Sequence, residues 1–175
     1  MRLFISLLLI GLLPVVSMAG PAENALEKSI QELRDSRGNW AVVTEFLAED
    51  GSVANTVEGN YQFNWVIEDR LLQGTNSIPA LEMNSGILFY VSEERGVIEM
   101  VSVGKDGKLW IMTGPLGGDS RTTQPYETQD GGEAQLRFTR FNVRPNSFES
   151  RMEYTEDGGV SWKPGNHQVF TRMDQ

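Results

Sequence analysis

The chain has 175 residues and no cysteine, and its 24 acidic residues outnumber its 15 lysines and arginines, which gives a formal net charge of −9. A chain of this length can bury a core of its own, which excludes a disulfide-stapled miniprotein. Because there is no cysteine, side-chain packing must stabilise the fold without disulfides. The negative charge repels phosphate backbones and anionic lipid, so we expect no nucleic-acid partner.

The first nineteen residues have the pattern of a secretory signal peptide. Arg2 precedes an apolar run over residues 3–16, and Ser17 and Ala19 supply the small residues of a cleavage site. We expect cleavage after Ala19, with Ala22 as the second candidate, and export to the periplasm or the medium. The run is short for a membrane span, so no membrane insertion of the mature chain is expected. Loss of the leader leaves 14 basic residues against 24 acidic ones, a formal charge of −10.

Residues 20–37 are expected to form one short helix. Leu26, Ile30 and Leu33 recur at helical spacing, and Gly38 can end the helix. From residue 38 onward the period of the apolar residues changes to two, most cleanly over residues 57–67, which is typical of strands with one buried face. Residues 38–175 are therefore predicted to form an all-β domain.

Turn signals divide this domain into short strands. They begin at residues 49, 68, 84, 94, 105, 117, 130, 144 and 156. Nine such turns predict about ten antiparallel strands, and residues 120–130 form the least regular segment, a longer loop. Closure into an up-and-down barrel removes the exposed edges of such a sheet, with a sandwich as the alternative. Gly59, Gly74 and Gly114 lie within strands, where a coiled sheet must bend.

The segment Thr155–Trp162, "TEDGGVSW", resembles the Asp-box of sialidases and related β-propellers. It occurs once, whereas propellers repeat it from blade to blade, and the chain has too few strands for a propeller. We interpret it as a hairpin device in which Asp157 accepts backbone N–H groups, Gly159 takes a positive φ and Trp162 packs on the hairpin.

A second motif concerns the two ends of the domain. Gly38 and Trp40 follow the helix, and Arg172 lies near the end of the last strand. This arrangement resembles the lipocalins and the wider calycin superfamily, in which a Gly-x-Trp on the first strand lies under a basic residue of the final strand. The resemblance implies that Arg172 stacks on Trp40, an arrangement that a cation–π contact stabilises.

The chain after Gly38 is also similar to uncharacterised bacterial exported domains with a lipocalin-like barrel. The residues that carry this likeness are the alternating run from Gly59 to Trp65, "KDGKLWIMTG", "EDGGVSW" and "VFTRM". The resemblance implies a fold and brings no agreed activity with it.

Few residues are typical of a catalytic or metal site. His167 is the only histidine, so with no cysteine we predict no metal site and no cofactor. Heme ligation by His167 is the alternative, because nitrobindin-like barrels share this architecture, but their Gly-x-Trp-x-Gly-x-Gly opening reads "GNWAVVTEF" here. Glu149 and Glu153 alternate with Arg151 and are expected to form a solvated charge ladder outside the barrel. No catalytic residue is predicted.

The inward face of the barrel is expected to be aromatic. The side chains predicted to line it are Tyr61, Phe63, Trp65, Phe89, Met112 (with Trp110 as the alternative at this position), Phe148, Met152 and Tyr154. Such a lining suits an apolar or planar ligand, although the same residues can also fill the interior as core. Arg140 shares a face with Leu136 and Phe138, so either a bulge turns it outward or it stands inside as an anchor for an anionic group.

Three functions are therefore compared. The first is an exported, non-enzymatic barrel that binds a small, largely apolar ligand in its lumen. The second is an enzyme that uses Glu or Arg residues at the barrel mouth, and the third is a fully packed structural or interaction module. A cavity separates the first from the third, and two inward charged groups at hydrogen-bonding distance would favour the second. The sequence gives no indication of oligomeric state.

Overall fold

Helix α1 (Pro21–Ser36) opens the part of the chain that the computed structural model describes, residues 20–173. Ile30 and Leu33 are buried against the barrel and Leu26 packs beside them, as their spacing predicts. The single N-terminal helix is therefore present, within one residue of the expected bounds at each end. The predicted leader, residues 1–19, lies outside the described residues. Within residues 20–173, no helix has the length and apolarity needed to cross a membrane.

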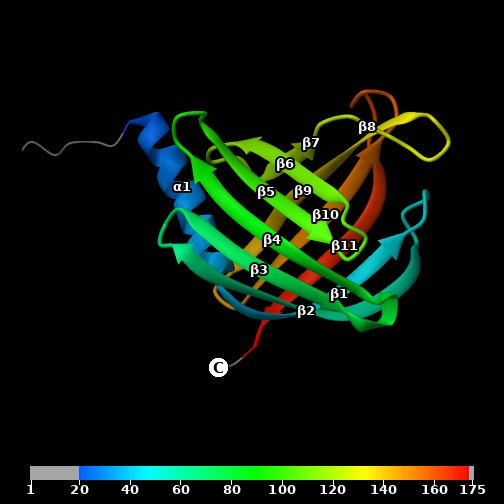
Figure 1. Ribbon diagram of the computed structural model, residues 1–175, viewed down its shortest axis with the longest axis horizontal. Helices are drawn as coiled ribbons and strands as arrows, with labels where there is room; N and C mark the ends of the chain where they lie inside the picture. The colour runs from blue at the N-terminus through cyan, green and yellow to red at the C-terminus, as the bar shows by residue number, and fades with distance from the viewer. Residues whose placement is uncertain (1–19, 174–175) are drawn as a thin grey trace, which may run out of the picture.

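A closed antiparallel β-barrel follows the helix (Figure 1). The strands of the described chain are β1 (Gly38–Leu47), β2 (Val53–Ile67), β3 (Leu71–Ile78), β4 (Met83–Ser92), β5 (Val97–Gly104), β6 (Leu109–Pro115), β7 (Ser120–Thr123), β8 (Tyr126–Glu127), β9 (Glu133–Arg144), β10 (Ser147–Thr155) and β11 (Lys163–Arg172). Ten of them form the ring, which the β9–β10 and β1–β11 pairings close, while β8 pairs only with β9 at its side. The predicted ten-stranded barrel is confirmed.

The helix covers one end of the barrel, which we call the closed end, and the opposite end carries the longer loops (Figure 1). The predicted turns coincide with the connections between strands, except the one expected at residues 84–86, which is wrong because these residues pair within β4. The chain reverses earlier, at a short 3₁₀ helix over Pro79–Leu81 and at Glu82, which has a φ of +50°. Pro79 has no N–H for a strand ladder, so the strand ends there.

Gly74 shapes the barrel wall next to the interior aromatic residues. It pairs with Phe63 across β2 and β3, and a Cβ at Gly74 would lie 2.4 Å from Cδ1 of the Phe63 ring. Only glycine lets the ring lie flat against the neighbouring strand, an arrangement that fills the gap left by the missing side chain.

The expected contact between the first and last strands is present. Trp40 pairs in register with Arg172, and the guanidinium carbon of Arg172 lies 4.2 Å from the centroid of the indole ring. Gly38 leaves room for this contact: its φ is +120°, and a Cβ there would lie 2.7 Å from Arg172 Nη1. The Gly-x-Trp motif and the terminal arginine thus form one unit.

This unit also holds the helix on the barrel. Arg172 donates hydrogen bonds from Nη1 to the carbonyl of Arg37 at 2.6 Å and from Nη2 to the carbonyl of Asp35 at 2.8 Å. The indole N–H of Trp40 donates to the carbonyl of Ser36 at 2.9 Å. The last carbonyls of a helix have no partner within the helix, so these three bonds satisfy the C-terminus of α1 and fix its position.

The Asp-box segment forms the β10–β11 hairpin. Asp157 accepts hydrogen bonds from the backbone N–H and the hydroxyl of Ser161 and from the hydroxyl of Thr155, and these bonds hold the pKa of Asp157 well below its usual range. Gly159 has a φ of +89°. Trp162 packs under the guanidinium of Arg137, 4.1 Å from its carbon. The bonds of Asp157 are local and agree with a role in the turn, whereas the contact of Trp162 with Arg137 reaches the neighbouring strand β9.

A cavity inside the barrel as the candidate functional site

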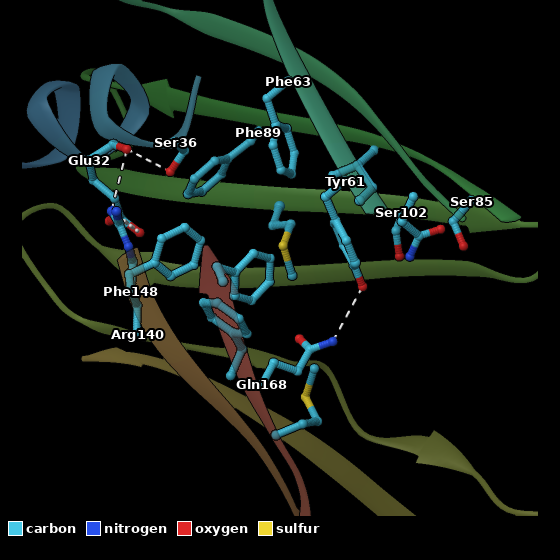
Figure 2. Close-up of a pocket in the computed structure, with 16 residues that line it drawn as sticks. Glu32, Ser36, Tyr61, Phe63, Ser85, Phe89, Ser102, Arg140, Phe148 and Gln168 are labelled. Atoms are coloured by element: carbon cyan, nitrogen blue, oxygen red, sulfur yellow. Dashed lines mark hydrogen bonds and ion pairs between the residues drawn. The ribbon is translucent and has the colours of Figure 1, made fainter. Parts of the chain in front are cut away.

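A cavity of about 170 Å³ lies inside the barrel (Figure 2). Half of the sixteen residues in its wall are aromatic or sulfur-containing: Tyr61, Phe63, Phe89, Phe138, Phe148 and Phe170, with Met100 and Met152. Ile87 completes the apolar part, and polar atoms come from Glu32, Ser36, Asn76, Ser85, Ser102, Arg140 and Gln168. The interior is therefore only partly filled by side chains, which argues against a fully packed barrel.

The aromatic side chains hold one another in place. The rings of Phe148 and Phe170 stack with centroids 4.2 Å apart, and Tyr61 meets Phe170 edge-on at 5.3 Å. Trp40 supports this group from the closed end, because its ring lies edge-on to Phe148 at 4.9 Å. Stacked and edge-on arrangements of this kind are the favoured geometries of aromatic pairs, so the rings stabilise one another in these positions.

Six of the nine residues predicted to face the ligand line this cavity. They are Tyr61, Phe63, Phe89, Arg140, Phe148 and Met152. Strand alternation places them correctly because the side-chain period of two fixes which face of the barrel a residue joins.

Trp65, Met112 and Tyr154 lie elsewhere, and the prediction that they line the cavity is corrected. Trp65 is partly buried against the core, but it borders a separate hollow at the C-terminal end of α1, which Arg172 also lines. Met112 is 3% exposed and pairs with Met100 across β5 and β6, but it is not part of the cavity wall. Tyr154 lies one residue before the end of β10, with the Lys163 ammonium 5.6 Å from its ring. Alternation fixes the face of a residue and leaves its depth along the barrel open.

Several residues of the cavity wall had no assignment from the sequence. Phe170 and Gln168 share a face of β11 with Arg172, which pairs with Trp40. The alternation along this strand could therefore have indicated that both side chains point into the barrel. Met100 lies in a strand whose residues are apolar on both faces, where alternation is lost. Glu32 belongs to the helix, whose polar residues give no indication that one of them enters the barrel.

Of the two positions open to Arg140, the interior one is correct. Arg140 is 7% exposed, and its guanidinium carbon lies 4.4 Å from the centroid of Phe148. The bulge expected as the alternative does exist, but two residues later: the β9–β10 register shifts after Phe141, where Asn142 has a φ of +49°. The shift therefore follows Arg140 and leaves its side chain inside.

A second interior arginine was not predicted. Arg121 of β7 is 1% exposed, and its Nη2 lies 2.6 Å from Oε2 of Glu32. Its guanidinium carbon lies 4.7 Å from the centroid of Phe89. Arg121 belongs to the segment of least regular pattern, where no alternation indicates which face of the barrel a residue occupies.

The closed end of the cavity is thus charged. Arg140 Nη1 lies 3.8 Å from Oε1 of Glu32 and donates to the Glu32 backbone carbonyl at 3.4 Å. Among residues 20–173, the buried side-chain atoms without a hydrogen-bond partner include Oε1 of Glu32, Nε and Nη1 of Arg121 and Nε of Arg140. Burial lowers the pKa of Arg140, and the charge of Glu32 opposes that shift. Figure 2 shows Glu32, Ser36 and Arg140 together beside the helix.

The opposite end of the cavity is polar and uncharged. Asn76, Ser85 and Ser102 line the cavity and also border a hollow at the loop end of the barrel, beside Met83 and Trp110. Figure 2 places Ser85 and Ser102 away from the charged group, with the aromatic rings between. The cavity therefore runs from a charged closed end through an apolar middle to a polar end that adjoins the surface.

His167 does not fit heme ligation inside this cavity. It lies among the residues of β11 that alternate outward, stacks on Phe141 and contacts Glu149 through Nε2 at 2.8 Å and Glu45 through Nδ1 at 3.2 Å. Partial burial lowers the pKa of His167, but the hydrogen bonds to the two carboxylates outweigh it and the pKa is raised overall. Both ring nitrogens are engaged with protein. No group of three or more His, Cys, Asp or Glu side chains in the described chain is placed to hold a metal ion.

No protein-family model matches this chain, and no curated protein matches it in sequence. Solved structures match its fold. The crystal structure of Rv2717c from M. tuberculosis aligns with 83% of this chain and 98% of its own, with a TM-score of 0.56 and 14% identity. A protein of unknown function of the DUF3598 family from Nostoc punctiforme aligns with 81% of this chain and 49% of its own, with a TM-score of 0.50 and 12% identity. At these identities the likeness concerns the fold alone, and together with the closed ring of strands it identifies a lipocalin-like barrel.

Proposed function

We propose that this chain is an exported, non-enzymatic barrel that binds a small, largely apolar ligand in its lumen. The observation that supports this most is the cavity wall, in which six aromatic rings and two methionines surround unfilled space. Burial of apolar ligand surface against such a wall stabilises a complex by about 25 cal/mol per Å². Packed apolar rings around a few polar groups are the usual composition of a small-molecule site.

The volume limits the size of the ligand. An apolar cavity of about 150 Å³ accommodates benzene, so about 170 Å³ suits a single ring or a short chain. A longer molecule would have to extend past Ser85 and Ser102 into the hollow at the loop end.

Export forms part of the proposal and rests on the leader pattern of residues 1–19. Cleavage after Ala19 would leave Gly20, the N-cap of α1, and Pro21, its first residue, in place. Cleavage after Ala22 would remove both. We therefore expect the intact mass of the protein from the extracytoplasmic fraction of its host to correspond to a chain that begins at Gly20. A mass that includes Met1–Ala19 would contradict export by a cleaved leader.

The binding proposal is tested with a matched pair of variants on β5. Ser102 lines the cavity, and its neighbour Val103 points outward and is 42% exposed. Neutral single-ring aromatics and lipophilic dyes should quench tryptophan emission saturably, with a stoichiometry near one, because Trp40 contacts the cavity wall. Ser102→Leu should weaken this binding at least about tenfold by occupying the space, and Val103→Leu should leave it unchanged. Equal effects of the two variants, or no saturable quenching by any compound, would refute binding in the lumen.

One observation favours an enzyme as the second candidate. Glu32 and Arg140 are inward charged groups that contact each other within the cavity. They stand at the closed end and not at the mouth, and Glu32 is already paired with Arg121. Turnover of small esters or lactones that disappears in Glu32→Gln would support the enzyme. The binding proposal predicts no turnover in either protein, while ligand binding persists in the variant.

A further inference from the structure

The closed end of the cavity holds more positive than negative charge. Two buried guanidinium groups, those of Arg121 and Arg140, share the single carboxylate of Glu32. Among the described residues in contact here, two positive charges face one negative charge, so one positive charge has no partner. An unpaired buried charge is costly, so a protein retains one where something else completes it.

The groups around this cluster do not remove the imbalance. The C-terminal part of α1 presents the Glu32 carbonyl to Arg140 at 3.4 Å, which is a weak contact at the limit of a hydrogen bond. Asp35 and Asp119 act on Arg140 from the surface, and Asp119 is itself paired with Lys28 at 2.9 Å. Nε of Arg140 and two nitrogens of Arg121 still have no acceptor within residues 20–173.

We propose that the ligand is a monoanion whose carboxylate binds Arg140 at the closed end while its apolar part lies among the aromatic rings. This inference rests on the proposed function and specifies the class of its ligand. Arg140 is the contacting residue because it lines the cavity, is 93% buried and has a free Nε. Arg121 does not line the cavity, so it acts through its charge.

The chemistry of the cluster selects a single negative charge. A guanidinium offers a planar pair of N–H donors that matches a carboxylate, and charge-assisted hydrogen bonds of this kind are about twice as strong as neutral ones. With one carboxylate from the ligand, the cluster would hold two positive charges, from Arg121 and Arg140, and two negative charges, from Glu32 and the ligand. A dianion such as a phosphate monoester would leave an excess negative charge beside Glu32 and should bind less well.

Benzoate and benzyl alcohol make a matched pair of probes, since both carry one ring and differ in charge. Calorimetric titrations at pH 7.5 should show benzoate binding at least about tenfold more tightly, the effect of one hydrogen bond to a charged group. Arg140→Met should remove this preference and leave the affinity for benzyl alcohol within about threefold. Arg151→Met is the control, because Arg151 lies on the outer face of β10 and is 54% exposed, and should leave both affinities unchanged.

Glu32→Gln provides a second test that keeps both arginines. Loss of the internal carboxylate leaves the positive charges of Arg140 and Arg121 unbalanced, so benzoate should bind Arg140 at least about threefold more tightly, while a purely structural role for Glu32 predicts equal or weaker binding. Equal affinities of the wild type for the two probes, with the closed end simply hydrated, would overturn the anion inference and leave lumen binding intact. Failure of both probes to bind would count against the proposed function itself.

Discussion

The contact between Trp40 and Arg172 should make a measurable contribution to stability that depends on both side chains. The test is a double-mutant cycle with Trp40→Leu and Arg172→Met, which removes the indole face and the guanidinium while keeping apolar bulk at both positions. In the structure the guanidinium carbon lies 4.2 Å from the ring centroid, and the indole is 1% exposed.

The magnitudes follow from these contacts. Arg172→Met removes two hydrogen bonds to helix carbonyls, worth about 2 kcal/mol together after allowance for partial exposure. Trp40→Leu removes a ring from the core and the bond to the Ser36 carbonyl, which should cost about 2–4 kcal/mol. The coupling between the two should be about 1–2 kcal/mol, the upper part of the range for cation–π pairs, because one face of the pair is buried.

Urea unfolding followed by far-UV circular dichroism gives the four free energies without relying on the emission of Trp40. The exterior pair of Arg151 and Phe141, 5.7 Å apart, serves as the control and should couple by no more than about 0.5 kcal/mol. If the effects at Trp40 and Arg172 add within about 0.3 kcal/mol, the two residues contribute independently and the closure argument is wrong.

Three further predictions concern residues away from this contact. The carboxylates beside His167 raise its pKa in the folded state, so its stabilising effect, up to about 1 kcal/mol, should be complete below its unfolded pKa near 6.5 and lost as the pH rises through the folded value. His167→Gln should therefore lower the free energy of unfolding at pH 5.5 more than at pH 8.5, and an equal loss at both pH values would contradict this. Gly74→Val should lower the free energy of unfolding by more than about 2 kcal/mol, because the new side chain meets the Phe63 ring, and a neutral result would mean that the ring can move aside. Leu33→Ala should cost about 3–5 kcal/mol since Leu33 is 0% exposed, and a loss below about 1 kcal/mol would show that the helix contributes little to the core.

The fold could be predicted because the patterns that indicate it are either local in the sequence or lie in the first and last strands of the barrel. Alternation in β2 and glycine at the turns indicated the number of strands, and the need to cover sheet edges indicated closure. Trp40 and Arg172 could be paired across 132 positions because a ring makes its first and last strands neighbours. The turn expected at residues 84–86 failed because turn-forming residues also occur in strands, and the proline before them ended β3 earlier.

The site could be predicted only in part, because parity gives a face and not a depth. Phe63 and Trp65 share a face of β2, yet the helix occupies the closed end and leaves Trp65 outside the cavity. The charged cluster depends on three segments that are far apart in the chain. Glu32 comes from a helix and Arg121 from a four-residue strand, and neither segment carries a pattern that reports a tertiary neighbour.

The central claim is that a small molecule binds inside the barrel, and methionine methyl NMR tests it most directly. Met100 and Met152 line the cavity, while Met83 and Met173 are 42% and 37% exposed, and Met112 is buried outside the cavity. Titration of ¹³C-methyl-methionine protein with benzoate or benzyl alcohol should shift the Met100 and Met152 resonances along one saturable curve and leave the other three in place. Unchanged Met100 and Met152 signals up to the solubility limit of both probes, or shifts confined to Met83 and Met173, would contradict binding in the lumen.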